Sequence, residues 1–308
     1  MRIVFMGTPD YSVKTLIALK KAGHDIVAVF AQPDKPVGRK QILTPPPTKV
    51  FALENGIPVH QPNSLRDGEA FKIVKSYSPD VIVVVAYGKI IPKEILEFPK
   101  YGCINGHASL LPKLRGASPI QWAIVTGEEY TGVTTMAMDE GMDTGDILDT
   151  VTVKIGDSET AEELFERLST LSADLMVLTL MKLQKGDIKP VKQDENAATY
   201  APIIKKEMAH IDFNNDAKTV FNAIRGYYSW PCAFFALGGK RIKVIEAEIF
   251  GPTNEAAGTV FEKNNDFCVS CGNNTSIKLI KVQPEGKQIM SASDMLRGNK
   301  NLVGQRAE

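Results

Sequence analysis

Two polar side chains that could work together stand at the end of an apolar run in the first half of the chain. Asn105 and His107 are two positions apart, and in a strand this spacing places both side chains on one face. An amide and an imidazole side by side can stabilise a developing oxyanion, and a histidine also exchanges protons near neutral pH. Single histidines at strand ends are common, so this pair alone is a weak signal of catalysis.

A second polar cluster occupies residues 138–146 and gathers four acidic residues around two glycines. Such a composition is also typical of a solvated turn. A calcium loop of the helix-loop-helix kind would need flanking helices and a bidentate glutamate at its last position, and this stretch offers neither. The remaining chemical interpretation is a carboxylate that orients or charges a histidine.

The first strand runs into Gly7-Thr8-Pro9-Asp10, which lacks the second and third glycines of a dinucleotide fingerprint. NAD is therefore disfavoured as a cofactor. Cys268 and Cys271 form a lone Cys-x-x-Cys in a stretch that is typical of a strand, with no second ligand pair nearby, so we expect no metal site.

The scaffold that positions these residues is predicted to be an α/β domain. Short runs rich in valine and isoleucine at residues 3–6, 25–31, 81–86 and 102–107 alternate with helical stretches, which is the pattern of a doubly wound, mainly parallel sheet of Rossmann-like type. Further strands are predicted at 133–137 and 147–155, and a long amphipathic helix at 160–184. In a parallel sheet, ligands bind at the carboxyl ends of the strands, which is where Asn105 and His107 stand.

The second part of the chain has another character. Residues 190–208 are polar and irregular, as expected for a linker between a catalytic domain at 1–189 and a smaller domain at 209–308. Beyond the linker, one helix near 217–225 precedes several short strands separated by Gly-Gly, Gly-Pro and Asn-Asn turns. This spacing predicts a small antiparallel β-barrel similar to an OB fold.

Composition limits the partners and the compartment. The chain has 36 basic and 36 acidic residues, so a polyanion must be met by a local basic patch. No apolar run approaches the roughly 20 residues that cross a bilayer. With four cysteines and no secretory signal, the sequence predicts a cytoplasmic protein that makes no membrane contact.

Taken together, the two polar clusters resemble those of the folate-dependent formyltransferase superfamily, whose pattern is Asn-x-His-x-Ser-Leu-Leu-Pro followed by an Asp-x-x-x-Asp-x-Gly loop. The resemblance implies that Asn105, His107 and Asp143 are the catalytic trio. Gly106 departs from the small apolar residue, such as valine, expected between the first two. The resemblance further implies folate contacts from two segments, represented by Ala86, Tyr87, Gly88, Ile90, Ser109, Leu110, Leu111 and Pro112.

Other stretches are similar to the branch of that superfamily that formylates methionyl initiator tRNA. They include Gly7-Thr8-Pro9, the segment from Gln32 through the prolines at 45–47, and Trp230-Pro231, so the similarity spans nearly the whole chain. The segment after Gln32 is also basic, which suits contact with a phosphate backbone. The tRNA contacts expected from this loop and the second domain are Lys35, Arg39, Lys40, Lys205, Lys206, Lys240 and Arg241.

The expected reaction is transfer of a formyl group from 10-formyltetrahydrofolate to the amino group of methionyl initiator tRNA, without a metal, by an enzyme expected to be a monomer. Two alternatives use related chemistry. A sugar-nucleotide formyltransferase also has a second domain, and a formyltetrahydrofolate hydrolase would use water as the nucleophile. Whether His107 acts as a base or as an oxyanion donor stays open at the level of sequence.

Overall fold

The computed structural model describes every residue of the 308-residue chain except residue 39. The chain forms two compact units. The first comprises residues 1–116, 131–153 and 165–201, and the second comprises residues 117–130, 154–164 and 202–308. The division of the chain at residues 189 and 208 into separable domains stays a prediction.

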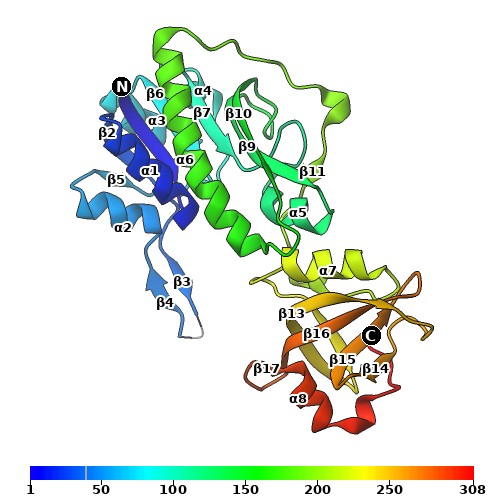
Figure 1. The fold of residues 1–308 in the computed structure, drawn as a ribbon. Helices are drawn as coiled ribbons and strands as arrows, with labels where there is room; N and C mark the ends of the chain where they lie inside the picture. Colours follow the sequence, from blue (N-terminus) through cyan, green and yellow to red (C-terminus); the bar gives the residue numbers. More distant parts are fainter. Residues whose placement is uncertain (39) are drawn as a thin grey trace. The chain divides into compact units, whose positions relative to one another are not determined.

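The first unit is built on a seven-stranded sheet with the order β10-β9-β7-β6-β1-β2-β5 (Figure 1). Strands β5, β2, β1, β6 and β7 are parallel neighbours, and β9 runs antiparallel to β7. The expectation of a mainly parallel α/β sheet is confirmed. The strands are β1 (Arg2–Gly7), β2 (Asp25–Phe30), β5 (Val59–His60), β6 (Val81–Val85), β7 (Cys103–His107), β9 (Tyr130–Ala137) and β10 (Ile147–Lys154).

Strand order determines where this sheet can bind a ligand. From β1 the chain continues to β2 and β5 on one side, and then crosses to β6 and β7 on the other side. The order therefore reverses between β1 and β6, and the carboxyl ends of strands at such a point are the usual ligand site of an open parallel sheet. The loops after β1, β6 and β7 all open at this edge.

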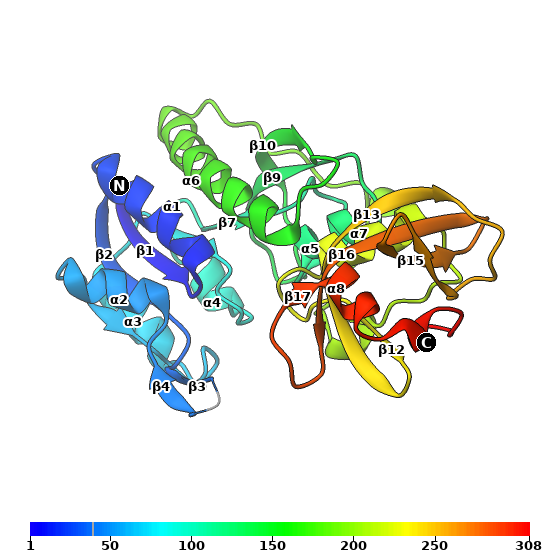
Figure 2. The same cartoon turned by 60° about the horizontal axis from the view of Figure 1, so that its bottom comes forward.

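Helices cover both faces of the sheet (Figures 1 and 2). On one face, α3 and α4 contribute Ala70, Val74, Ile95 and Leu96 to a core shared with alternate strand residues such as Val4 and Met6. On the other face, α1 packs beside α6 through the rings of Tyr11 and Phe165, whose centroids are 5.2 Å apart. The helices are α1 (Asp10–Lys21), α2 (Pro47–Glu54), α3 (Glu69–Tyr77), α4 (Lys93–Leu96) and α6 (Ala161–Lys185).

A two-stranded hairpin extends from the first unit beyond α2 (Figures 1 and 2). It consists of β3 (Lys35–Val37) and β4 (Ile42–Thr44), and all of its strand residues are exposed, including Val37, Ile42 and Leu43. The sequence indicated only a basic loop here, because the alternation of apolar and polar residues is too short to reveal the strands.

The segment between residues 191 and 201 is bound along its length to the first unit. Val191 exchanges two backbone hydrogen bonds with Ile147 of β10. Further on, β11 (Tyr200–Ala201) pairs in parallel with β8 (Arg115–Gly116). A 3₁₀ turn at Glu195–Ala197 lies between these two attachments, with Asp194 as its cap. This segment is therefore an ordered strap on the first unit.

The second unit contains the predicted antiparallel β domain. Its sheet has the order β12-β13-β16-β15-β14, with β17 beside β16. The strands are β12 (Phe234–Leu237), β13 (Lys240–Pro252), β14 (Val260–Lys263), β15 (Asp266–Cys271), β16 (Thr275–Pro284) and β17 (Met290–Ser291). Their inward residues, among them Phe235 and Phe267, form one core with α7 (Ala217–Gly226) and α8 (Ala292–Arg297). The expectation of a C-terminal antiparallel β domain is confirmed.

Residues 304–308 join the two ends of this strand order. Backbone hydrogen bonds link Gly304, Gln305 and Ala307 to Val260 and Gly258, at the start of β14. Glu308 then exchanges two backbone hydrogen bonds with Ala236 of β12. The first and last strands of the sheet are thus connected through this short segment.

Helix α5 (Pro119–Val125) belongs to the second unit, where it packs on α7. The two helices approach closely at Gly226, where an added Cβ would lie 2.5 Å from the side chain of Val125. The buried guanidinium of the adjacent Arg225 donates to the backbone carbonyls of Gly156 and Glu159. The second unit therefore includes segments from the middle of the sequence.

Two further 3₁₀ turns occur in the second unit, at Lys206–Ala209 and Lys300–Leu302.

Candidate functional site

The end of β7 presents the two residues singled out from the sequence. Asn105 and His107 are both almost fully buried, with 9% and 6% of their surface exposed. Gly106 lies on the opposite face, where an added Cβ would stand 3.0 Å from the hydroxyl of Ser172 and 3.4 Å from the methyl of Met176, both on α6. Glycine at this position lets α6 approach the strand, so the departure at Gly106 is accommodated by packing on the far side of the sheet.

The carboxylate of Asp143 stands beside this pair. Its Oδ1 is 3.4 Å from the amide nitrogen of Asn105 and 3.7 Å from Nδ1 of His107. Its Oδ2 accepts a 2.8 Å hydrogen bond from the backbone N–H of Gly116. The structure therefore brings together the three side chains that sequence analysis selected, although Asp143 is far from the others in sequence.

The hydrogen bond at Nε2 identifies the tautomer of the neutral His107 ring. Nε2 lies 2.9 Å from the carbonyl oxygen of Leu114. A carbonyl can only accept, so Nε2 carries a hydrogen and donates it. In the neutral ring, Nδ1 is then the unprotonated nitrogen, and it is the one that faces Asp143. This ring can accept a proton at Nδ1, and the neighbouring carboxylate would stabilise the resulting imidazolium.

The loop that carries Asp143 depends on close backbone contacts. Asp143 itself has a positive φ of 55°, a conformation that is costly for a residue with a side chain. Two residues on, a Cβ added to Gly145 would lie 1.7 Å from the carbonyl oxygen of Ala137. The loop can close on β9 only because residue 145 lacks a side chain.

We therefore expect Gly145→Ala to displace the Asp143 loop. Backbone atoms must move to relieve the clash, which costs on the order of 1–3 kcal/mol of stability and moves the carboxylate away from His107. The turnover number should fall at least about tenfold, because misplacement by about 1 Å is costly in catalysis. Thermal unfolding and steady-state kinetics measure the two effects. Gly298→Ala, whose new Cβ meets only ordinary contacts, is the matched control, and wild-type turnover in Gly145→Ala would contradict the expectation.

The neighbouring strand ends are tied into one surface by side-chain hydrogen bonds. After β1, the hydroxyl of Thr8 donates to the carbonyl of Tyr87, which follows β6. After β2, the amide of Gln32 donates to the carbonyls of Tyr87 and Gly88. The hydroxyl of Thr48 on α2 donates to the carbonyl of Gly7. The loops at the switch point are thus fixed relative to one another.

The predicted folate segments contain both accessible and buried groups. Ala86 and Gly88 are exposed, both with positive φ, and Ile90 has 68% of its surface exposed. The ring of Tyr87 instead lies in the core below the sheet, and burial raises the pKa of its hydroxyl to about 12. At the end of β7, Ser109 is buried and donates to the carbonyl of Lys113. The partly exposed members of this second segment are Leu110 and Pro112, while Leu111 is buried.

The predicted tRNA contacts fall in both units. In the first unit, Lys35 and Lys40 are exposed on or beside the hairpin, and Arg39 lies outside the described residues. Lys49, also in this basic segment, is not free to bind a phosphate, because its ammonium already donates to Asp34 and Gln61 at 2.8 Å. In the second unit, the predicted contacts Lys205, Lys206, Lys240 and Arg241 are all exposed, and Arg241 stacks on the ring of Phe234.

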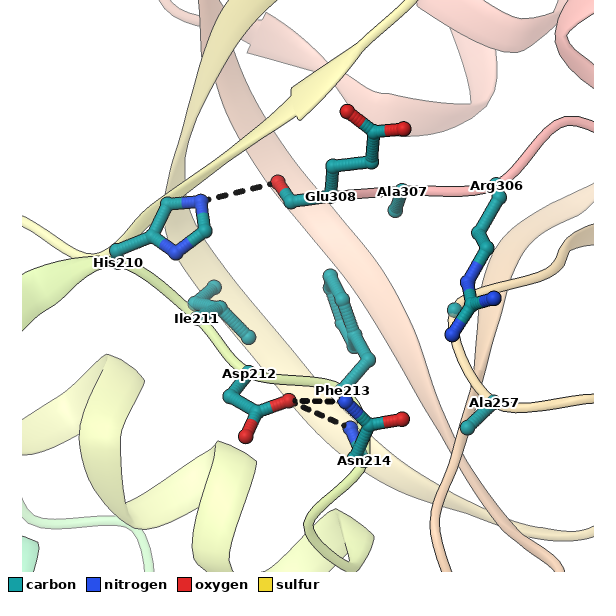
Figure 3. A pocket seen from close by; sticks show the side chains of 10 residues that line it. His210, Ile211, Asp212, Phe213, Asn214, Ala257, Arg306, Ala307 and Glu308 are labelled. Carbon is teal, nitrogen blue, oxygen red and sulfur yellow. Dashed lines mark hydrogen bonds between the residues drawn. The ribbon is translucent and has the colours of Figure 1, made fainter.

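Two hollows lie elsewhere on the surface. One, of about 340 Å³, is in the second unit between residues 210–214 and the segment 306–308 (Figure 3). Its polar rim is largely paired, because Asp212 binds Asn214 and His210 binds the carbonyl of Glu308. The other, of about 450 Å³, lies beside α4 and residues 138–141. Neither hollow is lined by Asn105, His107 or Asp143, so the convergence of side chains at the strand ends marks the site better than surface shape.

Three residues near the site were missed in the sequence. Arg115, Gln193 and Glu195 form a chain of hydrogen bonds that reaches the backbone of the Asp143 loop. Gln193 and Glu195 stand in a polar stretch that is typical of a linker. Arg115 opens a stretch, residues 115–121, that is similar to the same family, but that similarity assigned it no role. Its role is indicated by its burial, with no exposed surface, and burial is not visible in one sequence.

Comparison with known proteins matches both parts of the chain to formyl transferase families. Residues 1–180 match the family described as formyl transferase, and residues 203–300 match the formyl transferase C-terminal domain. A methionyl-tRNA formyltransferase of Bacillus cytotoxicus is 48% identical over 308 residues, which cover 99% of this chain and 98% of that protein. One from Thermodesulfovibrio yellowstonii is 47% identical over 298 residues, covering 97% and 96%.

Solved structures are similar in fold. A methionyl-tRNA formyltransferase from Clostridium thermocellum aligns with a TM-score of 0.52 at 24% identity, covering 81% of this chain and 94% of that one. An N-formyltransferase from Helicobacter canadensis, in complex with folinic acid and dTDP-3-aminofucose, aligns with a TM-score of 0.68 at 20% identity, covering 90% and 98%. At these identities the likeness concerns the fold.

Among the described helices, none is long and apolar enough to cross a membrane.

Proposed function

The chain belongs to the methionyl-tRNA formyltransferases of the formyl transferase family, and on this basis we propose that Asn105, His107 and Asp143 transfer the formyl group from 10-formyltetrahydrofolate to the amino group of methionyl initiator tRNA. The observation that carries this assignment is the approach of one oxygen of Asp143 to both other side chains, at 3.4 and 3.7 Å. The three groups face one point beside the carboxyl end of β7.

In the proposed reaction, the methionine nitrogen attacks the formyl carbon and a new C–N bond forms while the formyl oxygen becomes an oxyanion. An α-amino group has a pKa near 7.7, so a useful fraction is unprotonated at neutral pH. The amide of Asn105 donates to the oxyanion, an interaction worth about 3 kcal/mol in comparable sites. The carbonyl then re-forms as the bond between the formyl carbon and the folate nitrogen breaks.

One proton must move from the attacking amine to the departing folate nitrogen. His107 suits this transfer, because Leu114 holds its Nε2 and leaves Nδ1 as the exchanging nitrogen. The carboxylate of Asp143 stabilises the imidazolium that exists between the two transfers. This assignment makes His107 chiefly a proton carrier and Asn105 the oxyanion donor.

The cosubstrate is proposed to bind across the loops that follow β6 and β7. The backbone of Ala86 and Gly88 is accessible there, and Ile90, Leu110 and Pro112 offer apolar contact for the flat folate ring. Tyr87 and Ser109 support these loops from beneath, since their side chains are buried.

The hairpin β3–β4 is proposed to contact the tRNA. We expect Lys35→Gln combined with Lys40→Gln to raise the KM for charged tRNA several-fold at physiological salt while leaving the KM for folate unchanged, because exposed ammonium groups neutralise backbone phosphates. The difference from wild type should shrink as salt increases. Steady-state kinetics over a salt series measures it, with Lys75→Gln on α3 as a control. Equal KM values for variant and wild type would exclude a phosphate contact by these two residues.

The proposed function is tested by following both products in one assay. Tetrahydrofolate release and formylated tRNA should appear in equal amounts, and both should require initiator tRNA charged with methionine. Uncharged tRNA, and charged tRNA whose amine is already acetylated, are the controls. Release of folate that proceeds equally well without an acceptor would favour the hydrolase alternative, and formylation of an amino sugar nucleotide in preference to tRNA would favour the sugar alternative.

A further inference from the structure

A buried arginine lies one residue from the backbone group that holds Asp143. Arg115 has no exposed surface, yet it carries a permanent charge that burial makes costly unless it is fully bonded. Its Nη1 and Nη2 donate to the two carboxylate oxygens of Glu195 at 2.9 and 2.8 Å. Its Nε and Nη2 donate to Oε1 of Gln193 at 3.0 and 2.9 Å. Two residues of the 191–201 strap thus accept four hydrogen bonds from one guanidinium.

This arrangement determines which way the Gln193 amide points. Because a guanidinium only donates, the oxygen of Gln193 must face Arg115 and its NH₂ group must face away. That NH₂ group donates to the carbonyl of Asp143 at 2.8 Å and to the carbonyl of Gly145 at 2.7 Å. One amide therefore holds both ends of the turn in which Asp143 adopts its positive φ.

The carboxylate of Asp143 is held from the same side. Its Oδ2 accepts from the N–H of Gly116, the residue after Arg115. Gly116 is itself paired with Ala201 of the strap, and a Cβ at position 116 would lie 2.9 Å from the Ala201 carbonyl oxygen. The backbone and the side chain of Asp143 are both anchored to the element formed by β8 and the strap.

We propose that Gln193 and Arg115 are positioning residues for formyl transfer, which act by holding the strained Asp143 turn so that its carboxylate faces His107 and Asn105. Glu195 completes the bonding of Arg115, and the hydrogen bonds between them raise the pKa of Arg115 and lower the pKa of Glu195. Because Glu195 is 67% exposed, its own contribution is screened by solvent and is the smallest of the three. The inference rests on the proposed role of Asp143.

The test uses the full-length protein with Gln193→Glu. This change keeps the size of the side chain but replaces the NH₂ donor with an oxygen that faces two carbonyls, while Arg115 keeps its acceptor. The turnover number should fall about ten- to a hundredfold, whereas the KM values for tRNA and folate should stay within about twofold, because the turn orients a reacting group and not a binding group. Lys192→Gln, in the same strap with an exposed side chain, is the control and should behave as wild type.

A double-mutant cycle separates positioning from general stability. If Gln193 acts through Asp143, then Gln193→Glu should have little further effect on turnover in an Asp143→Asn background. Arg115→Lys should also lose turnover, since a lysine cannot replace a guanidinium that bonds two partners. All rates are measured well below the unfolding temperature of each variant.

The outcomes distinguish the inference from the function on which it rests. Wild-type turnover in Asp143→Asn would overturn the catalytic role of Asp143, and the positioning inference with it. An inactive Asp143→Asn together with normal turnover in Gln193→Glu would overturn the positioning inference alone. That inference would also be overturned if the effects of the two changes on turnover are additive, or if Gln193→Glu raises a KM without lowering turnover.

Discussion

Replacing Asp143 with asparagine is expected to lower the turnover number for tRNA formylation about a thousandfold. The variant keeps an oxygen that can accept from Gly116, so the loop should stay in place. It loses the negative charge beside Nδ1 of His107 and directs an NH₂ group toward both His107 and Asn105, where the wild type has Oδ1. His107→Asn should be similarly inactive, because the amide cannot carry a proton between the amine and the folate nitrogen.

Single-turnover formylation with saturating charged tRNA measures this loss directly. Glu140→Gln is the matched control, since it removes a carboxylate from the same loop that is exposed and only loosely paired with Lys93. Affinity for tRNA and the unfolding temperature should be close to wild type in all three variants. Turnover within tenfold of wild type for either Asp143→Asn or His107→Asn would remove that residue from the proposed mechanism.

A second large effect is expected from neutralising Lys205, Lys206 and Lys240 together in the second unit. Changing all three to glutamine should raise the KM for charged tRNA roughly ten- to a hundredfold at physiological salt. If each lysine meets a phosphate, the slope of log KM against log salt should decrease by about 0.7–0.9 for each lysine replaced. Arg241 is left in place because it stacks 3.4 Å from the centre of the Phe234 ring, and its loss would disturb packing.

The control for this triple variant removes equal charge elsewhere. Lys20→Gln, Lys75→Gln and Lys185→Gln combined take three exposed ammonium groups from helices of the first unit. Folate kinetics should be unchanged in both triple variants. An unchanged salt slope in the Lys205, Lys206 and Lys240 variant would mean that these lysines do not contact the tRNA backbone.

The main elements of the fold were predictable because their signals are local. Alternating apolar runs and helical stretches predicted strands such as β1 and β6 and the long helix α6, and period-two spacing predicted that Asn105 and His107 would share a face. These patterns depend on residues within a few positions of one another. Predicting that the two polar clusters meet at one site also required the family resemblance.

What could not be predicted depends on contacts between distant positions. The bonds of Arg115 to Gln193 and Glu195 span 78 and 80 residues, and no local pattern records them. The positive φ of Asp143 follows from contacts that a helix or strand propensity does not include. Likewise, the inclusion of α5 in the second unit follows from its packing on α7, where Gly226 lies just over one hundred positions beyond Val125.

The segment at 304–308 has a consequence for solubility. An unpaired edge strand offers a row of free backbone donors and acceptors to other chains, and many proteins aggregate through such edges. In the second unit, Gly304 to Ala307 cover β14, while Glu308 pairs with Ala236 of β12 and Ile211 bonds to Phe234 of the same strand. Proteolytic loss of residues 304–308 would expose β14 and part of β12 at once, and self-association should then precede any loss of the core that Phe235 and Phe267 share.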